Sequence, residues 1–432
     1  MIDEKVEKMI LEESKLENFV TPRYESYNFA NISGTVEEVL GGDNGRSLPE
    51  DVFEDVDTEG VKNVALVFVD AFGFVQWKKY GGGLDFFSNL IENGRVTPLT
   101  TIFPSETAAA VTTMNTGLTP QEHSVVSWRV FLEELDTTIR TLPFTTLDKK
   151  DPKKLKEGID VSVLYGSETV FNRLKSEGVT STGIIPKSIE GSDYNSYMMK
   201  EASVKGFQNA FDMALKLRKS IESSERKNYF HCYTDQVDSA LHEYGPDTEE
   251  HISQLEAVSQ ALQKQLVEKL SPEKAEETLL IVVADHGQAD VNPDDITDLL
   301  SFEIVKENLE RDQKGEMILP TGGPRATILH IQEGKEDKVK NFLDDELNAR
   351  VFRTSEALEK GLFGKGEVNN RSRLGDIVVI PKEEEKMIWY EHEDHKGYSD
   401  YEGHHGGMSK AEMLVPFATA KISDLKREAE NN

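Results

Sequence analysis

Three short apolar runs, each followed at once by an acidic residue, constrain the fold of this chain more than any other feature of its 432 residues. They are Val64–Val69 before Asp70, Tyr229–Thr234 before Asp235, and Leu279–Ala284 before Asp285 and His286. Continuous apolar runs of this length are typical of parallel strands buried on both faces of a sheet. The carboxyl ends of such strands meet at one edge, where α/β proteins bind their ligands. We therefore expect Asp70, Asp285 and His286 to lie together at that edge.

Helical patterns separate these runs, so that β and α segments alternate along the chain. The predicted helices are Asp85–Asn93, Ser203–Glu222 and Glu249–Leu270. This alternation predicts an α/β fold with a doubly wound, mostly parallel sheet flanked by helices.

The expected domain boundaries lie where this alternation stops. Residues 61–290 and 403–425 should form the α/β core, with a less regular insert at about 131–193, and residues 1–60 an N-terminal extension. Residues 291–402 contain the predicted strands Ala326–Ile331 and Asp376–Ile380 and the amphipathic helix Lys335–Leu347. This late segment is predicted to be a small α+β insertion, or cap subdomain.

Charge and composition exclude several classes of partner. The chain has 79 acidic and 49 basic residues, a formal net charge of −30, which repels nucleic-acid polymers and anionic membrane surfaces. Its single cysteine, Cys232, cannot form an intramolecular disulfide. The N-terminal residues lack an apolar signal segment, and no stretch approaches about 18 uninterrupted apolar residues. We expect a soluble cytoplasmic protein that acts on a small molecule, with its oligomeric state left open.

Several histidines and carboxylates have the character of metal ligands. Asp238 and His242 are four residues apart, so a helix would present both on one face to one cation. The alternative is an ion pair on the helix surface. The metal-ligand interpretation gains weight because the pair follows closely after the end of a buried strand. The adjacent Asp285 and His286 would offer two ligands at the sheet edge, against an alternative of an Asx turn with a solvent-exposed histidine. The segment 403–407, Gly-His-His-Gly-Gly, is flexible enough to bring an imidazole to the site, or is a polar loop.

Thr107 is the candidate nucleophile. It lies in Phe-Pro-Ser-Glu-Thr, before an Ala-rich stretch that predicts a helix beginning near Ser105. The first turn of a helix has free N–H groups and a positive dipole end, which favour an alkoxide and a phosphoryl group. The alternative is an ordinary helix-terminal threonine, with Ser105 as the N-cap.

The order of these motifs resembles the type I phosphodiesterase/nucleotide pyrophosphatase family of the alkaline phosphatase superfamily. The matching motifs are V-D-A-F-G, F-P-S-E-T with T-G-L-T-P-Q-E-H, V-D-S-A-L-H-E-Y-G-P, A-D-H-G and G-H-H-G, which span Asp70 to Gly407. The resemblance implies an alkaline-phosphatase-like fold and a metal-dependent hydrolase that cleaves phosphate esters through a phospho-threonine intermediate. It leaves the N-terminal extension, the middle insert and the late insertion uncovered.

The resemblance also implies two divalent metal ions and their ligands. One ion would be held by Asp70, Thr107, Asp285 and His286, and the other by Asp238, His242 and His405. His405 fits the family's Gly-x-His-Gly pattern, with His404 as the alternative, and Asp235 is expected behind the ligands. Mixed histidine and carboxylate ligands favour zinc, with manganese or magnesium as alternatives.

One departure from the family concerns the substrate. Where nucleotide pyrophosphatases usually carry an asparagine that contacts a phosphate oxygen, this chain has Trp128, beside Arg129. Trp128 is interpreted as a wall of the cleft, with a stacking platform for a base or sugar as the alternative. Arg129, and Arg325 and Lys365 of the late insertion, are candidate substrate or phosphate contacts.

Three other functions compete with a phosphodiesterase. A phosphomonoesterase, phosphonate hydrolase or phosphomutase could use the same site. A sulfatase is disfavoured because the usual Cys/Ser-x-Pro-x-Arg setting does not surround Thr107. A non-catalytic binding or signalling relative would show lost metal ligands, and the motifs here retain all of them.

Overall fold

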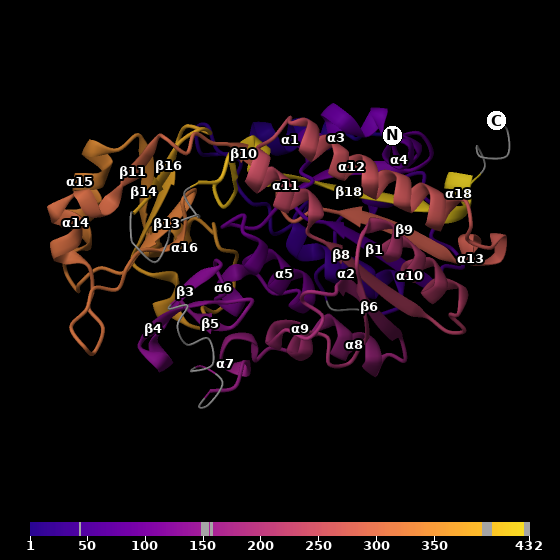
Figure 1. The fold of residues 1–432 in the computed structure, drawn as a ribbon, viewed down its shortest axis with the longest axis horizontal. Helices are drawn as coiled ribbons and strands as arrows, with labels where there is room; N and C mark the ends of the chain where they lie inside the picture. Colours follow the sequence, from indigo (N-terminus) through magenta and orange to yellow (C-terminus); the bar gives the residue numbers. More distant parts are fainter. Residues whose placement is uncertain (43–44, 148–154, 156–158, 391–399, 427–432) are drawn as a thin grey trace.

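The computed structural model describes residues 1–42, 45–147, 155, 159–390 and 400–426. A seven-stranded sheet runs through the larger part of the molecule in the order β2-β18-β9-β1-β8-β6-β7 (Figure 1). Its strands are β1 Asn63–Val69, β2 Arg95–Thr100, β6 Thr180–Pro186, β7 Ser203–Phe207, β8 Asn228–Thr234, β9 Thr278–Val283 and β18 Leu414–Lys421. β18 runs antiparallel to both of its neighbours, while β9, β1, β8, β6 and β7 are parallel. The predicted α/β fold with a mostly parallel sheet is confirmed.

The central strands are apolar because both faces of the sheet are covered. Every residue of β1 and β9 is buried, as the uninterrupted apolar runs predict. One group of contacting helices comprises α4 Asp85–Asn93, α10 Ala210–Glu222, α12 Glu249–Ala261 and α18 Ile422–Lys426. A second group comprises α2 Ile32–Val39, α5 Thr107–Thr116 and α8 Val170–Ser176. Hydrophobic side chains of both groups join the strands in one large core.

Further α-helices belong to this part of the molecule. They are α1 Glu4–Glu13, α3 Phe74–Tyr80, α6 Pro120–His123, α7 Ser162–Tyr165, α9 Asp193–Met198, α11 Gln236–Tyr244, α13 Pro272–Glu276 and α17 Lys410–Met413. The N-terminal segment packs onto the sheet, since Ile2 bridges to Val96, Asn28 bridges to Thr100, and Phe29 is fully buried. Within the described residues, no helix combines the length and the apolar character needed to cross a membrane.

The late segment forms a second body with its own core at one end of the molecule (Figure 1). Its four-stranded sheet has the order β12-β13-β15-β14, and it carries three helices. Their bounds are β12 Thr321–Gly323, β13 Ala326–Leu329, β14 Ala349–Arg353, β15 Ile377–Pro381, α14 Glu303–Asn308, α15 Glu336–Glu346 and α16 Thr354–Glu359. The α+β composition expected for this segment is present, and the exact domain boundaries stay a prediction.

A third, small sheet lies in the middle insert. It consists of β3 Arg129–Leu132, β4 Thr137–Arg140 and β5 Thr145–Thr146. The remaining strands are short: β10 Ala289–Asp290 pairs with β17 Gly403–His404, and β11 Ile296–Asp298 pairs with β16 Met387–Trp389. The range 131–193 expected to be an insert also contains β6, which belongs to the central sheet.

One element prediction was wrong, and one helix begins two residues later than its expected start. Ser203–Glu222 is not one helix: Ser203–Phe207 forms edge strand β7, and α10 begins after Asn209, whose side chain accepts from the N–H of Asp212. The helix predicted from near Ser105 begins at Thr107, because Ser105 donates its hydroxyl to the carbonyl of Gly407 and Glu106 has extended backbone angles. Consequently Thr107 is the first residue of α5.

Candidate active site

The carboxyl ends of β1 and β9 bring the first three predicted residues together. The two strands pair in parallel register, with Phe68 opposite Val283. Nε2 of His286 lies 3.5 Å from an oxygen of Asp70 and 3.3 Å from an oxygen of Asp285. All three side chains are buried, and they form one group that could hold a metal ion. The prediction that these residues share the sheet edge agrees with this geometry.

Thr107 lies at the same place because α5 begins there. Its Oγ1 is 3.0 Å from Nε2 of His286. As the first residue of a ten-residue helix it stands next to N–H groups that have no partner within the helix. The hydroxyl is therefore next to both a candidate ligand and a region of positive potential.

A second group of candidate ligands adjoins the first. On α11, Asp238 and His242 lie on one face, with 3.4 Å between an oxygen of Asp238 and Nε2 of His242. The ring of His405 stacks on that of His286, with 3.7 Å between centroids, and lies 5.1 Å from that of His242. Asp238, His286 and His405 form a group that could hold an ion.

Backbone carbonyls orient the imidazoles of this second group. Nδ1–H of His405 donates to the carbonyl of Ser105 over 2.9 Å, and Nδ1–H of His242 donates to that of Gly403 over 2.7 Å. A carbonyl oxygen can only accept, so in each ring Nε2 is left as the lone-pair nitrogen. His404 lies on β17 and, like His242, it belongs to neither ligand group among the described residues, whereas His405 belongs to one of them. The geometry thus favours His405 over His404.

The donor set fits divalent cations. One oxygen each of Asp70 and Asp285 is buried and has no hydrogen-bond partner in the part of the chain that the structure describes. Burial, and then the nearby Asp285 carboxylate, raise the pKa of Asp70 well above its usual value. Burial, and then the rings of His286 and His242, hold the pKa of His405 well below its usual range. Buried carboxylates beside imidazole rings are an arrangement that a bound cation would stabilise.

Three groups behind the candidate ligands were not predicted from the sequence. The hydroxyl of Tyr233 donates to Asp70 over 2.6 Å, and the side-chain amide of Gln288 donates to Asp238 over 2.6 Å. The N–H of Ala71, a residue with a φ of 62°, donates to Asp285 over 3.2 Å. Tyr233 could have been found from its position at the end of an apolar run next to Asp235. Nothing in the local pattern marks Gln288.

One predicted substrate contact, Trp128, lies at a cavity next to the candidate ligands. Trp128 is half-buried and lines a cavity next to Thr107, as expected for a wall of the cleft. Neighbouring Glu106 is buried, which raises its pKa to about 7 although the N–H of Trp128 and the hydroxyl of Ser127 oppose the shift. Asp235 also lines the cavity and belongs to neither ligand group.

The structure does not bring the three basic candidates to the cavity. The guanidinium of Arg129 lies over the ring of Trp389, 5.5 Å from its centroid. Arg325 is buried, pairs with both oxygens of Glu412 and donates to two backbone carbonyls. Lys365 is exposed and lies 2.8 Å from Glu25. The prediction of Arg325 as a phosphate contact was wrong, because its hydrogen-bonding capacity is used inside the protein.

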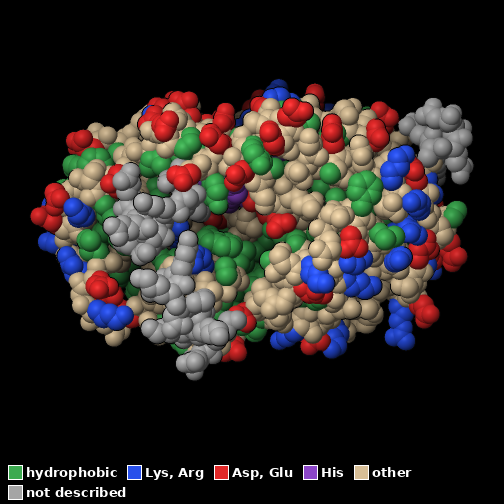
Figure 2. Space-filling model, viewed as in Figure 1, with side chains coloured by type: hydrophobic (Ala, Val, Ile, Leu, Met, Phe, Trp, Pro, Cys, Tyr) green, Lys and Arg blue, Asp and Glu red, His purple; other side chains and the backbone are tan. Residues whose placement is uncertain are grey.

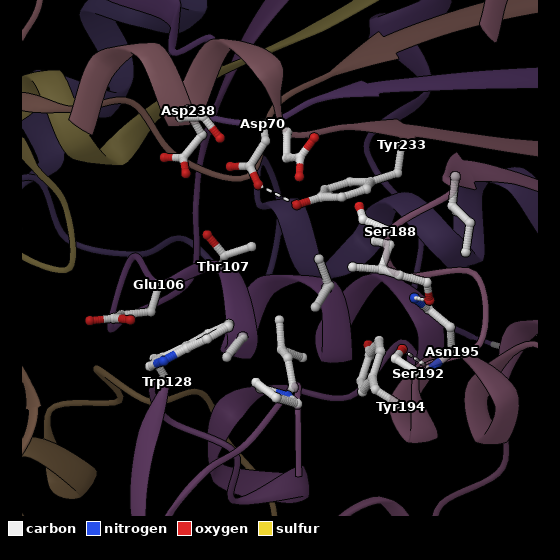
Figure 3. Close-up of a pocket in the computed structure, with 18 of the residues that line it drawn as sticks. Asp70, Glu106, Thr107, Trp128, Ser188, Ser192, Tyr194, Asn195, Tyr233 and Asp238 are labelled. Atoms are coloured by element: carbon white, nitrogen blue, oxygen red, sulfur yellow. Dashed lines mark hydrogen bonds between the residues drawn. The ribbon is translucent and has the colours of Figure 1, made fainter. Parts of the chain in front are cut away.

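The cavity has a volume of about 570 Å³ and extends from the candidate ligands into the molecule. Figure 3 shows Asp70, Asp238 and Thr107 at one end, Glu106 and Trp128 at one side, and Ser188, Ser192, Tyr194 and Asn195 away from the ligands. In the space-filling view its mouth is a hollow near the middle of the molecule, with hydrophobic side chains beside a histidine (Figure 2).

Comparisons with known proteins agree with this geometry. A family model described as type I phosphodiesterase/nucleotide pyrophosphatase matches residues 64–408. Murine ectonucleotide pyrophosphatase/phosphodiesterase 5, in an inactive form complexed with AMP, has a similar structure: TM-score 0.59 and 18% identity, over 86% of this chain and 94% of that chain. Phosphonoacetate hydrolase from Sinorhizobium meliloti 1021, complexed with phosphonoacetate, is also similar: TM-score 0.60 and 15% identity, over 86% and 95%. No curated protein matches the chain in a sequence comparison.

Proposed function

The chain belongs to the type I phosphodiesterase/nucleotide pyrophosphatase family, and from this premise we propose that it cleaves phosphodiesters through a phospho-threonine intermediate on Thr107. Membership makes it a phosphoric ester hydrolase of the alkaline phosphatase superfamily. The substrate type, the intermediate and the identity of the ions are the parts that we propose.

One observation carries the proposal: the Thr107 hydroxyl contacts the imidazole that the two groups of candidate ligands have in common. Its Oγ1 is 3.0 Å from Nε2 of His286, the residue that both groups share. We propose two divalent ions, one held by Asp70, Thr107, Asp285 and His286 and the other by Asp238, His242 and His405. The mixture of imidazoles and carboxylates favours zinc, with manganese and magnesium as alternatives.

Bound divalent ions would lower the pKa of the threonine hydroxyl and stabilise negative charge on the attacking and leaving oxygens. The oxygen of Thr107 gives up its proton and attacks phosphorus in line, and the bond to the ester oxygen opposite breaks, so that this oxygen leaves as an alcohol after taking up a proton. The phosphorus, which still carries the second ester group, becomes covalently attached to Thr107. The helix N-terminus of α5 favours the negative charge of that group. Water then displaces Thr107 from the opposite side, so that two inversions give net retention at phosphorus.

The decisive experiment compares bis-p-nitrophenyl phosphate, p-nitrophenyl phosphate, p-nitrophenyl phenylphosphonate and phosphonoacetate as substrates, with zinc or manganese. For the wild type we expect the diester to be preferred, and Thr107→Ala to lower kcat by about 10³-fold or more. Acid quenching during turnover of bis-p-nitrophenyl phosphate, followed by mass spectrometry, should find a p-nitrophenyl phosphate group on the peptide that contains Thr107.

Thr116→Ala is the matched control, since the hydroxyl of this buried threonine of the same helix donates to the carbonyl of Thr112 and accepts from the N–H of Leu118, away from the candidate ligands. It should keep wild-type kcat. Unchanged activity in Thr107→Ala would remove this residue as the nucleophile, and preference for phosphonoacetate would favour a phosphonate hydrolase on the same site.

A further inference from the structure

The four-stranded sheet of the late segment has a strand whose outer edge is open. β14 stands last in the order β12-β13-β15-β14, and all five of its residues pair with β15 in antiparallel register. A cavity of about 490 Å³ is lined by the consecutive residues 349–352 of β14, and none of its described lining residues belongs to β15. A cavity on a face of the sheet would touch alternate residues of a strand, so this one is a groove along the edge.

The register of β14 identifies the backbone groups that face this groove. In an antiparallel pair, residues that bond to the neighbouring strand alternate with residues whose N–H and C=O groups point away from it. The N–H of Lys382 donates to the carbonyl of Asn348, so the even-numbered residues of β14 are the ones that bond to β15. The N–H and C=O groups of Ala349 and Val351 therefore point outward. Neither residue has another backbone hydrogen bond within the described parts of the chain.

The other edges of the two larger sheets are covered in ways that β14 lacks. Isolated bridges from Ile2 and Asn28 pair with β2, and the N–H of Gly206 in β7 donates to the side chain of Glu190 over 3.0 Å. The opposite edge of the four-stranded sheet, β12, contacts β3 of the middle insert. Proteins also protect edge strands with prolines or bulges, and β14 has neither. Its open edge can therefore accept a further strand.

Two helices on opposite faces of β14 form the walls of the groove. Val339 and Leu343 of α15 pack with Val351 in the core of the late segment, whereas Ala357 of α16 packs with Phe352 in the large core. An added strand would lie between these helices, with successive side chains facing α15 and α16 in turn. β14 and α15 lie at the end of the molecule away from the central sheet (Figure 1).

The charges around the groove indicate which kind of strand it would accept. Lys340 and Asp344 of α15 pair with each other over 2.6 Å. The other basic lining residues form no ion pair within the described residues: Arg350, Lys360 and Lys382. The other acidic ones are Glu356, which accepts from the N–H of Arg353, and Glu359. With four basic and three acidic side chains, the groove is net positive in a chain whose net charge is −30.

We propose that the open edge of β14 is a docking surface for an extended acidic segment of a partner protein, which binds by adding a strand to the four-stranded sheet. Ala349 and Val351 would supply the backbone pairing, and the unpaired cations of the groove would select carboxylates. A second copy of β14 fits less well, because it would bring two sets of these cations together between two chains of charge −30.

The net charge of the chain does not exclude such a partner. At physiological ionic strength, exposed charges are screened beyond about 8 Å, so a short acidic segment responds mainly to the side chains of the groove. A long polyanion would meet the acidic remainder of the surface as well. The docking surface does not depend on the hydrolase reaction, and its test needs no measurement of activity.

Fluorescence anisotropy with a capped hexapeptide of alternating Glu and Val tests the docking surface. We expect saturable binding, and an affinity about tenfold lower for the same peptide with Gln in place of Glu. Hydrogen exchange should slow in the segment that contains Ala349 and Val351 when the acidic peptide is bound. Absence of saturable binding at about 1 mM peptide, or equal affinity for the Gln peptide, would overturn the proposal.

N-methylated peptides distinguish strand addition from other modes of binding. An added strand bonds to β14 through every second amide, so methylation of one alternate set of amides should abolish binding, while methylation of the other set should be tolerated. These peptides leave the protein unchanged, so the result does not depend on the folding of a variant. Equal binding of the two methylated peptides would rule out strand addition.

Variants of the groove complete the test. Lys360→Glu/Lys382→Glu should weaken binding of the acidic peptide about tenfold. Lys314→Glu/Lys338→Glu is the matched control, because these exposed lysines do not line the groove and the net charge changes by the same amount. An equal loss in both double variants would assign the binding to net charge and overturn the proposal.

Sedimentation tests the second copy as the occupant. Val351→Pro removes an outward N–H and leaves the bonds between β14 and β15 in place, so it should weaken binding of the acidic peptide without changing the oligomeric state. A dimer of the wild type that Val351→Pro dissociates would identify a second copy as the partner and overturn the assignment to an acidic segment.

Discussion

Gln288 is a positioning residue whose importance depends on a single hydrogen bond. The amide nitrogen of Gln288 donates to Asp238, and the residue is 1% exposed. Its amide oxygen lies close to Gly403: a Cβ added to that glycine would be 2.4 Å from this oxygen. Gln288→Met keeps the volume and removes the donor, leaving Asp238 free to rotate. We expect the affinity of the variant for the ion assigned to Asp238, His242 and His405 to be about 10–100-fold lower than that of the wild type.

Calorimetric titration of metal-free protein with zinc measures this change independently of activity. Gln332→Met, which removes an amide that bonds only to backbone carbonyls in the late insertion, is the control and should bind zinc like the wild type. Identical titrations of Gln288→Met and wild type would contradict the prediction.

At the residue scale, the sequence could locate the candidate ligands and missed the residues that orient them. Asp70, Asp285 and His286 follow apolar runs, and parallel strands bring such ends together whatever the length of chain between them. Gln288 and Tyr233 each contact a candidate ligand through a single hydrogen bond that depends on the packing of distant segments. Arg325 was misassigned because its partner Glu412 is 87 residues away and has no recognisable spacing from it.

The ion pair of Arg325 and Glu412 connects two elements, the turn between β12 and β13 and the short helix α17. Both side chains are buried, and Arg325 also donates to the carbonyls of Glu383 and Lys386. Arg325→Met would leave Glu412 charged and buried, which should lower the free energy of unfolding by about 3–5 kcal/mol. Urea denaturation measures the change, and Arg325→Met/Glu412→Gln should recover part of it.

The same pair gives stability a defined pH dependence. Burial alone would raise the pKa of Glu412, but the charge and hydrogen bonds of Arg325 and the N–H of Gly407 lower it below its usual value of 4.5. A carboxyl with a lowered folded pKa stabilises fully above its unfolded pKa and loses that contribution as the pH falls through the folded pKa. Between pH 5 and 3 the wild type should therefore lose more stability than the double variant. If the free energy of unfolding fell equally with pH in the wild type and in the double variant, the pH dependence would not come from Glu412.

At the element scale, burial decided which predictions succeeded. The uninterrupted runs that became β1 and β9 can only be covered strands. Edge strand β7 was taken for helix because only Phe207 of Ser-Val-Lys-Gly-Phe is buried, and the strand has no apolar run to mark it. The start of α5 depended on Ser105, whose hydroxyl bonds to Gly407, 302 residues away, instead of capping the helix.

At the scale of the whole molecule, bound ions should act as cross-links between distant segments. The candidate ligands come from segments that are far apart in the sequence: the ends of two strands, a helix and the segment 403–407. They are Asp70, His286, Asp238 and His405, and all four belong to the two groups that could hold an ion. An ion at 100 times its Kd stabilises the folded state by about 2.7 kcal/mol. With an unfolding entropy of about 2.1 cal/mol/K per residue, chelation should lower Tm by about 3 °C.

Nonspecific screening must be separated from this effect, since the net charge of −30 makes any added cation stabilising to some degree. Differential scanning fluorimetry should therefore compare EDTA, zinc and sodium chloride at equal ionic strength for wild type and Asp70→Asn. The variant loses one carboxylate ligand but changes the net charge by only one unit. We expect the zinc-dependent gain in Tm to shrink in Asp70→Asn while the response to sodium chloride stays unchanged. An equal zinc-dependent gain in both proteins would mean that the ion stabilises the chain through its surface and not through this site.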